Sequence, residues 1–410
     1  MLSNCRALDL TDEKGFFCGK VLADLGSDVI KIEPPGGDSA RRIGPFYHDI
    51  CHPEKSLFWF AYNTNKRGIT LDIETKTGQD IFKKLVKTAD FVIESYRPGY
   101  MEKLGLGYTQ LSKVNPGIIM SSISPFGSDG PYKDYESSDI VNAAMGGVMY
   151  LYGDPDRPPV RVSCPQTHFN ASIYAATGML IAYHYRKTSG EGQHVDVSQQ
   201  ESMLPLTFNA IPHWLLNERL VRRSGSMRVG LSGPGIQRQT WPCQDGSIHF
   251  TLMGWKAGQK TNTALVEWMD SEGMADEFLK SIDWSTFDMV HATKEWLQEV
   301  EDRFGKFFIS HTKAGLFDEA INRRVMLYPV YSPEEVTEEV HLKSRDFWNE
   351  VEHPELGTTI TYPGAFAKCS EYPIHIRQRA PLIGEHNEEV YEELGIFKEQ
   401  KVALRQAGII

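Results

Sequence analysis

This sequence of 410 residues lacks three features that would assign it to a particular class of protein. Its six cysteines are scattered without paired spacing, which argues against a disulfide scaffold and favours reduced thiols in the cytoplasm. No apolar run approaches the roughly 20 residues of a membrane-spanning helix, and the first residues do not read as a signal peptide. Basic residues are not in excess, since 43 lysines and arginines stand against 54 aspartates and glutamates. With a formal net charge of −11, we predict no nucleic-acid partner and no membrane segment.

Metal-binding patterns are also absent. The nearest approach is His48, Cys51 and His52, whose spacing fits no zinc template and is explained equally well by a polar loop. We therefore predict no metal site.

Short buried runs alternate with helical segments in the first half of the chain. Strands are expected at residues 6–10, 28–33, 69–72, 91–94, 118–123 and 193–197. Helices are expected at residues 15–25 and 77–88. These strands are apolar throughout and do not alternate between apolar and polar residues. Such strands, with helices between them, are typical of a parallel sheet covered on both faces. The chain is long enough for such a sheet and a second domain.

Residues 157–198 organise the rest of the chain. Small and apolar residues dominate residues 167–185 without a clean polar face, so we predict a helix covered on most sides, with Thr167 able to cap its start. A basic, glycine-containing turn at residues 187–192 should end the helix before a short strand.

The same stretch resembles the signature of the family III CoA-transferases, which include formyl-CoA transferase, carnitine CoA-transferase and methylacyl-CoA racemase. The matching residues fall in register without a gap: Pro158, Pro159, Gly178, Leu180, Ala182, Arg186, Gly190, Gly192, Gln193, Val195, Val197 and Ser198. Residues 22–33 and 379–395 match further family signatures, so the resemblance spans nearly the whole chain. It implies an α/β fold, with a large Rossmann-like parallel-sheet domain and a smaller α+β domain in an interlocked dimer. The expected parts are 1–220 and 331–410 for the large domain and 221–330 for the small one.

The resemblance breaks at the catalytic position, where His168 stands in place of the family's nucleophilic aspartate. In the family, that carboxylate attacks a thioester to give an anhydride and then carries CoA as an enzyme thioester. An imidazole has no acyl carbon to which sulfur can bond, so His168 cannot replace the aspartate in this role. No permanently bound cofactor is implied, and CoA enters as part of the substrate.

Three hypotheses remain open. In the first, the chain is the nucleophile-lacking subunit of a heteromeric CoA-transferase of the succinyl-CoA:benzylsuccinate type, paired with a homologous subunit that carries the aspartate. The substrates would then be a CoA thioester such as succinyl-CoA and a carboxylic acid such as an aryl-substituted succinate. In the second, it is a stand-alone acyl-CoA enzyme, racemase-like, that uses His168 as a base, although Ser138 occupies the position of the racemases' catalytic histidine. In the third, it is a binding or structural homologue without catalysis.

A nucleotide such as CoA should lie at the carboxyl ends of the parallel strands. Its phosphates require fixed cations and hydrogen-bond donors. The candidates for CoA binding are Arg41, Arg42, Lys66, Arg67, Leu71, Ser95, Tyr96, Arg97 and Lys103. The basic residues could also be solvated loop charges, and the resemblance favours Arg67, Arg97 and Lys103. Two positions argue against an intact site, because Glu74 and Ser124 fall where formyl-CoA transferase has lysines.

A glycine-rich loop that covers the active site in formyl-CoA transferase corresponds to Gly233 and Gly235 here. Glycines allow the backbone turns that a lid requires. Pro234 and Ile236 should make this loop stiffer.

Overall fold

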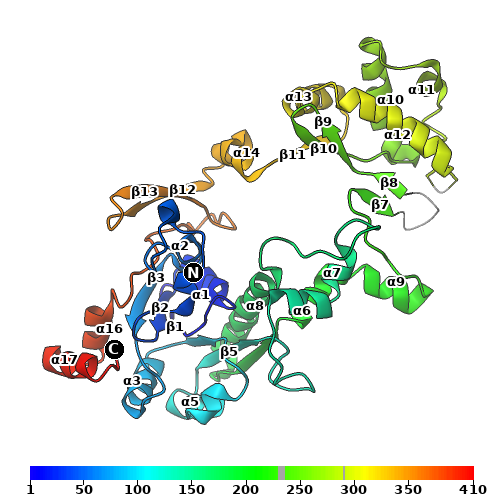
Figure 1. Ribbon diagram of the computed structural model, residues 1–410. Helices are drawn as coiled ribbons and strands as arrows, with labels where there is room; N and C mark the ends of the chain where they lie inside the picture. Colours follow the sequence, from blue (N-terminus) through cyan, green and yellow to red (C-terminus); the bar gives the residue numbers. More distant parts are fainter. Residues whose placement is uncertain (230–235, 290) are drawn as a thin grey trace. The chain divides into compact units, whose positions relative to one another are not determined.

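A computed structural model describes residues 1–229, 236–289 and 291–410 of the chain (Figure 1). The chain divides into two compact units. The larger unit combines Met1–Val148, Val162–Asn209 and Lys343–Ile410, and the smaller unit combines Met149–Arg161 and Ala210–Leu342. The carboxyl-terminal segment therefore returns to complete the larger unit.

A six-stranded parallel sheet forms the centre of the larger unit, in the order β3-β2-β1-β4-β5-β6. The strands are β1 (Arg6–Asp9), β2 (Asp28–Glu33), β3 (Lys66–Thr70), β4 (Phe91–Glu94), β5 (Ile119–Ser124) and β6 (His194–Ser198). The α/β fold with a parallel sheet is thereby confirmed. The strand order reverses between β1 and β4, and such a switch point opens a crevice outside the carboxyl ends of the strands.

Helices cover both faces of this sheet. One face packs against α3 (Lys76–Val86), α5 (Tyr108–Val114) and the carboxyl-terminal α16 (Asn387–Glu393), through residues such as Phe82, Leu111 and Tyr391. The other face packs against α1 (Phe16–Asp24) and α8 (Gln166–Ser189), through Leu22, Ala175 and Met179. The small side chains of α8 allow the helix to lie close to the sheet.

Shorter elements complete the larger unit. They are η1 (Ser39–Arg42), η2 (Tyr47–Asp49), α2 (Leu57–Asn63), α4 (Tyr100–Lys103), α6 (Asp139–Met145), η3 (Glu201–Thr207), β12 (Trp348–His353), β13 (Thr358–Pro363) and α17 (Lys398–Gln406). The two short helices α7 (Val148–Leu151) and α15 (Val340–Ser344) lie where the chain passes between units.

The smaller unit is built on a three-stranded antiparallel sheet in the order β11-β10-β9. The strands of this sheet are β9 (Thr240–Cys243), β10 (Gly246–Phe250) and β11 (Leu327–Val330). Two further strands of the unit, β7 (Met227–Val229) and β8 (Ile236–Arg238), pair as a separate antiparallel hairpin. Its helices are α9 (Ala210–Asn217), α10 (Trp255–Ser271), α11 (Glu277–Ser281), α12 (Lys294–Phe308), α13 (Lys313–Arg323) and α14 (Pro333–Glu338). Buried aromatic side chains, including Trp241, Trp268 and Phe304, fill its core. No described helix is both long and apolar enough to cross a bilayer.

One expectation for α8 is wrong. Thr167 does not cap the helix; instead its amide and hydroxyl both donate to Asp139 Oδ1, at 3.0 and 2.9 Å. The larger unit itself covers only part of the helix, because Ile181 is 66% exposed and Tyr185 58% exposed. The uniform apolarity of α8 therefore reflects one face on the sheet and a second apolar face that the larger unit leaves uncovered.

Candidate functional site

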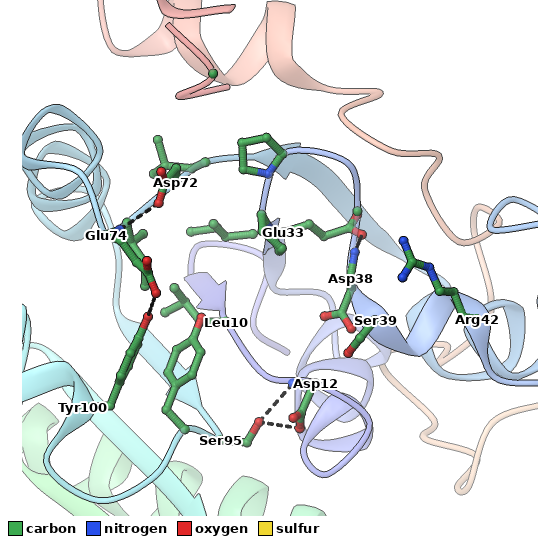
Figure 2. Close-up of a pocket in the computed structure, with 18 residues that line it drawn as sticks. Leu10, Asp12, Glu33, Asp38, Ser39, Arg42, Asp72, Glu74, Ser95 and Tyr100 are labelled. Carbon is green, nitrogen blue, oxygen red and sulfur yellow. Dashed lines mark hydrogen bonds between the residues drawn. The ribbon is translucent and has the colours of Figure 1, made fainter.

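A cavity of about 690 Å³ lies at the carboxyl ends of the first four strands of the sheet, next to the switch point between β1 and β4 (Figure 2). The loops after these strands supply most of its wall, as expected for an open parallel sheet. The lining residues are Leu10, Asp12, Ile32, Glu33, Pro34, Pro35, Gly37, Asp38, Ser39, Arg42, Leu71, Asp72, Ile73, Glu74, Ser95, Tyr96, Tyr100 and Gly408.

Several carboxylates of this wall have their own cations. Glu33 accepts hydrogen bonds from Arg41 at 2.6 and 2.8 Å, with both side chains buried. Asp38 lies 3.2 Å from the ammonium of Lys31, and Asp12 pairs with Lys14. These three carboxylates are therefore neutralised within the larger unit.

Asp72 and Glu74 have different surroundings. Neither takes part in an ion pair between side chains that the structure describes. The Glu74 amide donates to Asp72 Oδ1 at 2.9 Å, and the Tyr100 hydroxyl donates to Glu74 Oε1 at 2.8 Å (Figure 2). Burial, together with that hydrogen bond to a carboxylate, raises the pKa of Tyr100 to about 12. This side of the cavity is therefore negatively charged, with a phenol held as a donor.

Four of the nine predicted CoA-binding residues line the cavity, namely Arg42, Leu71, Ser95 and Tyr96. Ser95 also accepts a hydrogen bond from the Asp12 amide at 2.9 Å, which ties β4 to β1 across the switch point. Arg42 is the cation of this set, and the part of the chain that the structure describes gives it no carboxylate partner.

Three other predicted ligands do not line the cavity and have carboxylate partners of their own. Arg41 and Lys66 are fully buried, and the Lys66 ammonium lies 2.8 Å from the carboxylate of Asp9. Arg67, at the start of β3, pairs with Asp28 at 2.7 Å and with Glu393 at 2.8 Å. Their roles as CoA ligands stay predictions, and burial disfavours them for Arg41 and Lys66.

The remaining predicted residues lie outside the cavity wall as well. The Arg97 side chain is 77% exposed and pairs with Glu136. Lys103 is exposed at the end of α4. Ser124 is buried and accepts a hydrogen bond from the Gly127 amide at 2.9 Å. Gly233 and Gly235 lie outside the described residues.

Sequence reasoning missed most of the acidic wall, namely Asp12, Glu33, Asp38 and Asp72. The available signal was their position, because each follows or ends a predicted strand.

His168 lies in the first turn of α8, beside the contact between Thr167 and Asp139. Both of its ring nitrogens are buried and have no hydrogen-bond partner among the described residues. Burial lowers the pKa of His168 below its usual value, while the nearby charge of Asp139 opposes this shift. The lowered pKa favours the neutral imidazole, and its two buried nitrogens have no hydrogen-bond partner in the part of the chain that the structure describes.

Comparison with known proteins places these features in context. A family model described as CoA-transferase family III matches residues 2–387. The subunit BbsE of succinyl-CoA:(R)-benzylsuccinate CoA-transferase from Thauera aromatica is 34% identical over 96% of this chain and 94% of its own length. Succinyl-CoA–D-citramalate CoA-transferase from Chloroflexus aurantiacus is 32% identical over 96% of this chain and 93% of its own length. A CAIB/BAIF family protein from Brucella suis superposes with a TM-score of 0.82 at 25% identity, over 96% of this chain and 99% of that one.

Proposed function

The chain belongs to CoA-transferase family III, and on that premise we propose that it is the nucleophile-lacking subunit of a heteromeric CoA-transferase. Its partner would be a homologous subunit that carries the family's aspartate. The complex would move CoA from a thioester such as succinyl-CoA to a carboxylic acid, with an aryl-substituted succinate as the acceptor class. The likeness to a benzylsuccinate CoA-transferase subunit supports both the heteromer and the acceptor. We place this complex in the cytoplasm.

The observation that carries this proposal is that His168, whose two ring nitrogens are buried, stands at the position of the aspartate. In the family's reaction, the aspartate carboxylate attacks the donor thioester and releases CoA thiolate, leaving a mixed anhydride. The thiolate then attacks the aspartate carbonyl, which forms an enzyme thioester and releases the donor acid. The acceptor carboxylate reverses these two steps. An imidazole can accept an acyl group but cannot supply the acyl carbon of the enzyme thioester, so transfer requires the aspartate of another chain.

An uncovered apolar face supports the presence of a partner. On α8, Ile173, Tyr174, Ile181 and Tyr185 are between 41% and 66% exposed. In η3, which packs against α8, Leu204 and Leu206 are also more than 40% exposed. Exposed apolar residues in such number on one unit are typical of a surface that another chain covers. We propose that the homologous subunit covers this face in an interlocked dimer.

Co-expression with the homologous subunit tests the proposal. We expect CoA transfer only by the complex, and intact mass after incubation with succinyl-CoA should show a CoA adduct on the partner alone. Replacing the partner's aspartate with alanine should abolish both, whereas His168→Ala and His168→Gln in this chain should retain transfer. Transfer by this chain alone, lost in His168→Ala, would contradict the proposal. A folded chain with neither activity nor a partner would favour the non-catalytic homologue.

A second candidate is a stand-alone acyl-CoA enzyme that uses His168 as a general base. It is favoured by the neutral imidazole, whose two nitrogens are buried and unpartnered among residues 1–229, 236–289 and 291–410. However, Ser138 stands where a second base would be needed, and it lies at the start of α6. We expect a base of this kind to exchange the α-proton of a 2-methylacyl-CoA with deuterium oxide. Exchange by the isolated chain, absent in His168→Gln, would favour this candidate.

A further inference from the structure

The cavity at the carboxyl ends of the strands has two sides of opposite charge. Figure 2 shows Arg42 on one side and Asp72 with Glu74 on the other. The remaining lining carboxylates, Glu33, Asp38 and Asp12, are already neutralised by Arg41, Lys31 and Lys14. The unpaired charge on the wall, as far as the structure describes it, is therefore one cation against two carboxylates.

Four backbone donors around the cavity are also occupied. The amides of Asp12, Asp38 and Glu74 donate to Ser95 Oγ, Glu33 Oε2 and Asp72 Oδ1, at 2.9, 2.8 and 2.9 Å. The Ala40 amide, at the start of η1, donates to Asp38 Oδ1 at 2.9 Å. Phosphate sites in open α/β sheets use such backbone N–H groups at the ends of strands as ligands. Here protein oxygens, mostly carboxylate, already accept these hydrogen bonds.

CoA carries a pyrophosphate and a 3′-phosphate, so its nucleotide needs free cations and free N–H groups. A carboxylate facing a nucleotide admits ribose hydroxyls and disfavours a ribose phosphate, as the acidic residue of dinucleotide-binding folds does. Glu74 and the neighbouring Asp72 line the cavity in the loop after β3, and they would face a nucleotide bound there. Nearby like charges in a partly enclosed cavity are poorly screened by salt.

We propose that this cavity excludes CoA, with Asp72 and Glu74 as the residues that determine the exclusion. This inference rests on the proposed function for its consequence: a complex with the aspartate-bearing homologue would bind one CoA per pair of subunits. The homologous subunit would then bind CoA and carry the nucleophile, and this chain would contribute the apolar surface of the subunit interface.

Equilibrium dialysis with CoA tests the exclusion in two preparations. The full chain alone should show no saturable CoA binding at millimolar concentrations, with circular dichroism confirming that it is folded. The complex should bind one CoA per pair. Two equivalents in the complex, or micromolar binding by the chain alone, would overturn the proposal. If no complex forms, the proposed function fails while the measurement on the chain alone still decides the exclusion.

A charge reversal assigns the exclusion to the acidic wall. Glu74→Lys should raise the affinity of the chain for CoA by at least about tenfold, because a repulsive contact becomes an attractive one. Glu277→Lys, at a side chain that is 96% exposed in the smaller unit, makes the same change in net charge elsewhere. A gain in Glu74→Lys alone supports the proposal. An equal gain in both variants, or none in Glu74→Lys, would overturn the assignment to this wall.

Discussion

Lys66 and Arg41 in the interior of the larger unit, and Asp72 and Glu74 on the cavity wall, are charged residues with opposite surroundings. The Lys66 ammonium makes its three hydrogen bonds to Asp9 Oδ2, the Phe16 carbonyl and Asn63 Oδ1, at 2.8, 2.9 and 2.9 Å. Asp72 and Glu74 instead face the cavity and have no cationic partner in the structure as described. The interior cations are satisfied by the protein, whereas the wall carboxylates are available to repel or accept a ligand.

This difference shows that a charged residue type at a strand end does not by itself indicate a phosphate ligand. Burial of a cation is tolerated only where carboxylates and carbonyls replace its water. Once those partners are in place, the cation has no capacity left for a ligand.

The largest effect is expected when an interior pair is broken. Burial alone would raise the pKa of Asp9, but the charges of Lys66 and Lys31 hold it below its usual value. Lys66→Met leaves that carboxylate buried without its closest cation, and the loss of stability should be roughly 3–5 kcal/mol. Urea unfolding measures it. The double variant Lys66→Met/Asp9→Asn should recover much of the loss, and a loss in Lys66→Met below about 1 kcal/mol would contradict the interior role.

A buried carboxylate without any cation should behave in the opposite way. Glu94, at the end of β4, has no ion pair in the described structure, and burial raises its pKa to about 7. The folded state therefore binds more protons than the unfolded state between the usual glutamate pKa and about 7, and stability falls as pH rises through this window.

Glu94→Gln removes this penalty. At pH 8 we expect the variant to be more stable than the parent chain by up to about 3 kcal/mol, with no gain at pH 4. Urea unfolding at several pH values measures the difference. Glu267→Gln, at an exposed position in α10, serves as the control. The opposite result would be a parent chain that becomes more stable between pH 5 and 7 while the stability of Glu94→Gln stays constant. That result would show that folding does not raise the pKa of Glu94.

A half-buried network should give a smaller effect. Arg67→Gln removes contacts with Asp28 and Glu393 and should cost about 1–2 kcal/mol, because these pairs are partly exposed. The same variant should leave CoA binding by the complex unchanged if Arg67 serves the fold. Lys76→Gln, in an exposed pair with Asp80, is the matched control and should change neither quantity. A loss of CoA affinity at full stability would return Arg67 to the list of ligands.

The order of strands and helices could be predicted because it depends on local patterns. All six strands of the parallel sheet were expected, and all but β3 lie within one residue of their predicted bounds. The start of β3 was expected three residues late, because Lys66 reads as a loop residue and its partner Asp9 lies 57 positions earlier. The carboxylates of the cavity wall could have been found from their places at strand ends, but the sequence does not show which of them are paired with cations. Which charges are paired depends on contacts between distant segments, and a linear pattern does not contain them.

The smallest effect is expected at Arg42, and it gives the closest control for the whole contrast. Arg41 and Arg42 are neighbours in η1, but Arg41 is fully buried between Glu33 and Glu54 while Arg42 faces the cavity. Arg42→Gln should change stability by no more than about 0.5 kcal/mol, as for exposed positions in general. Arg41→Gln should lower the stability by several times more, because it leaves the carboxylates of Glu33 and Glu54 without their cation. Thermal unfolding of the two variants compares adjacent, chemically identical residues, and equal losses would show that burial and pairing do not separate their roles.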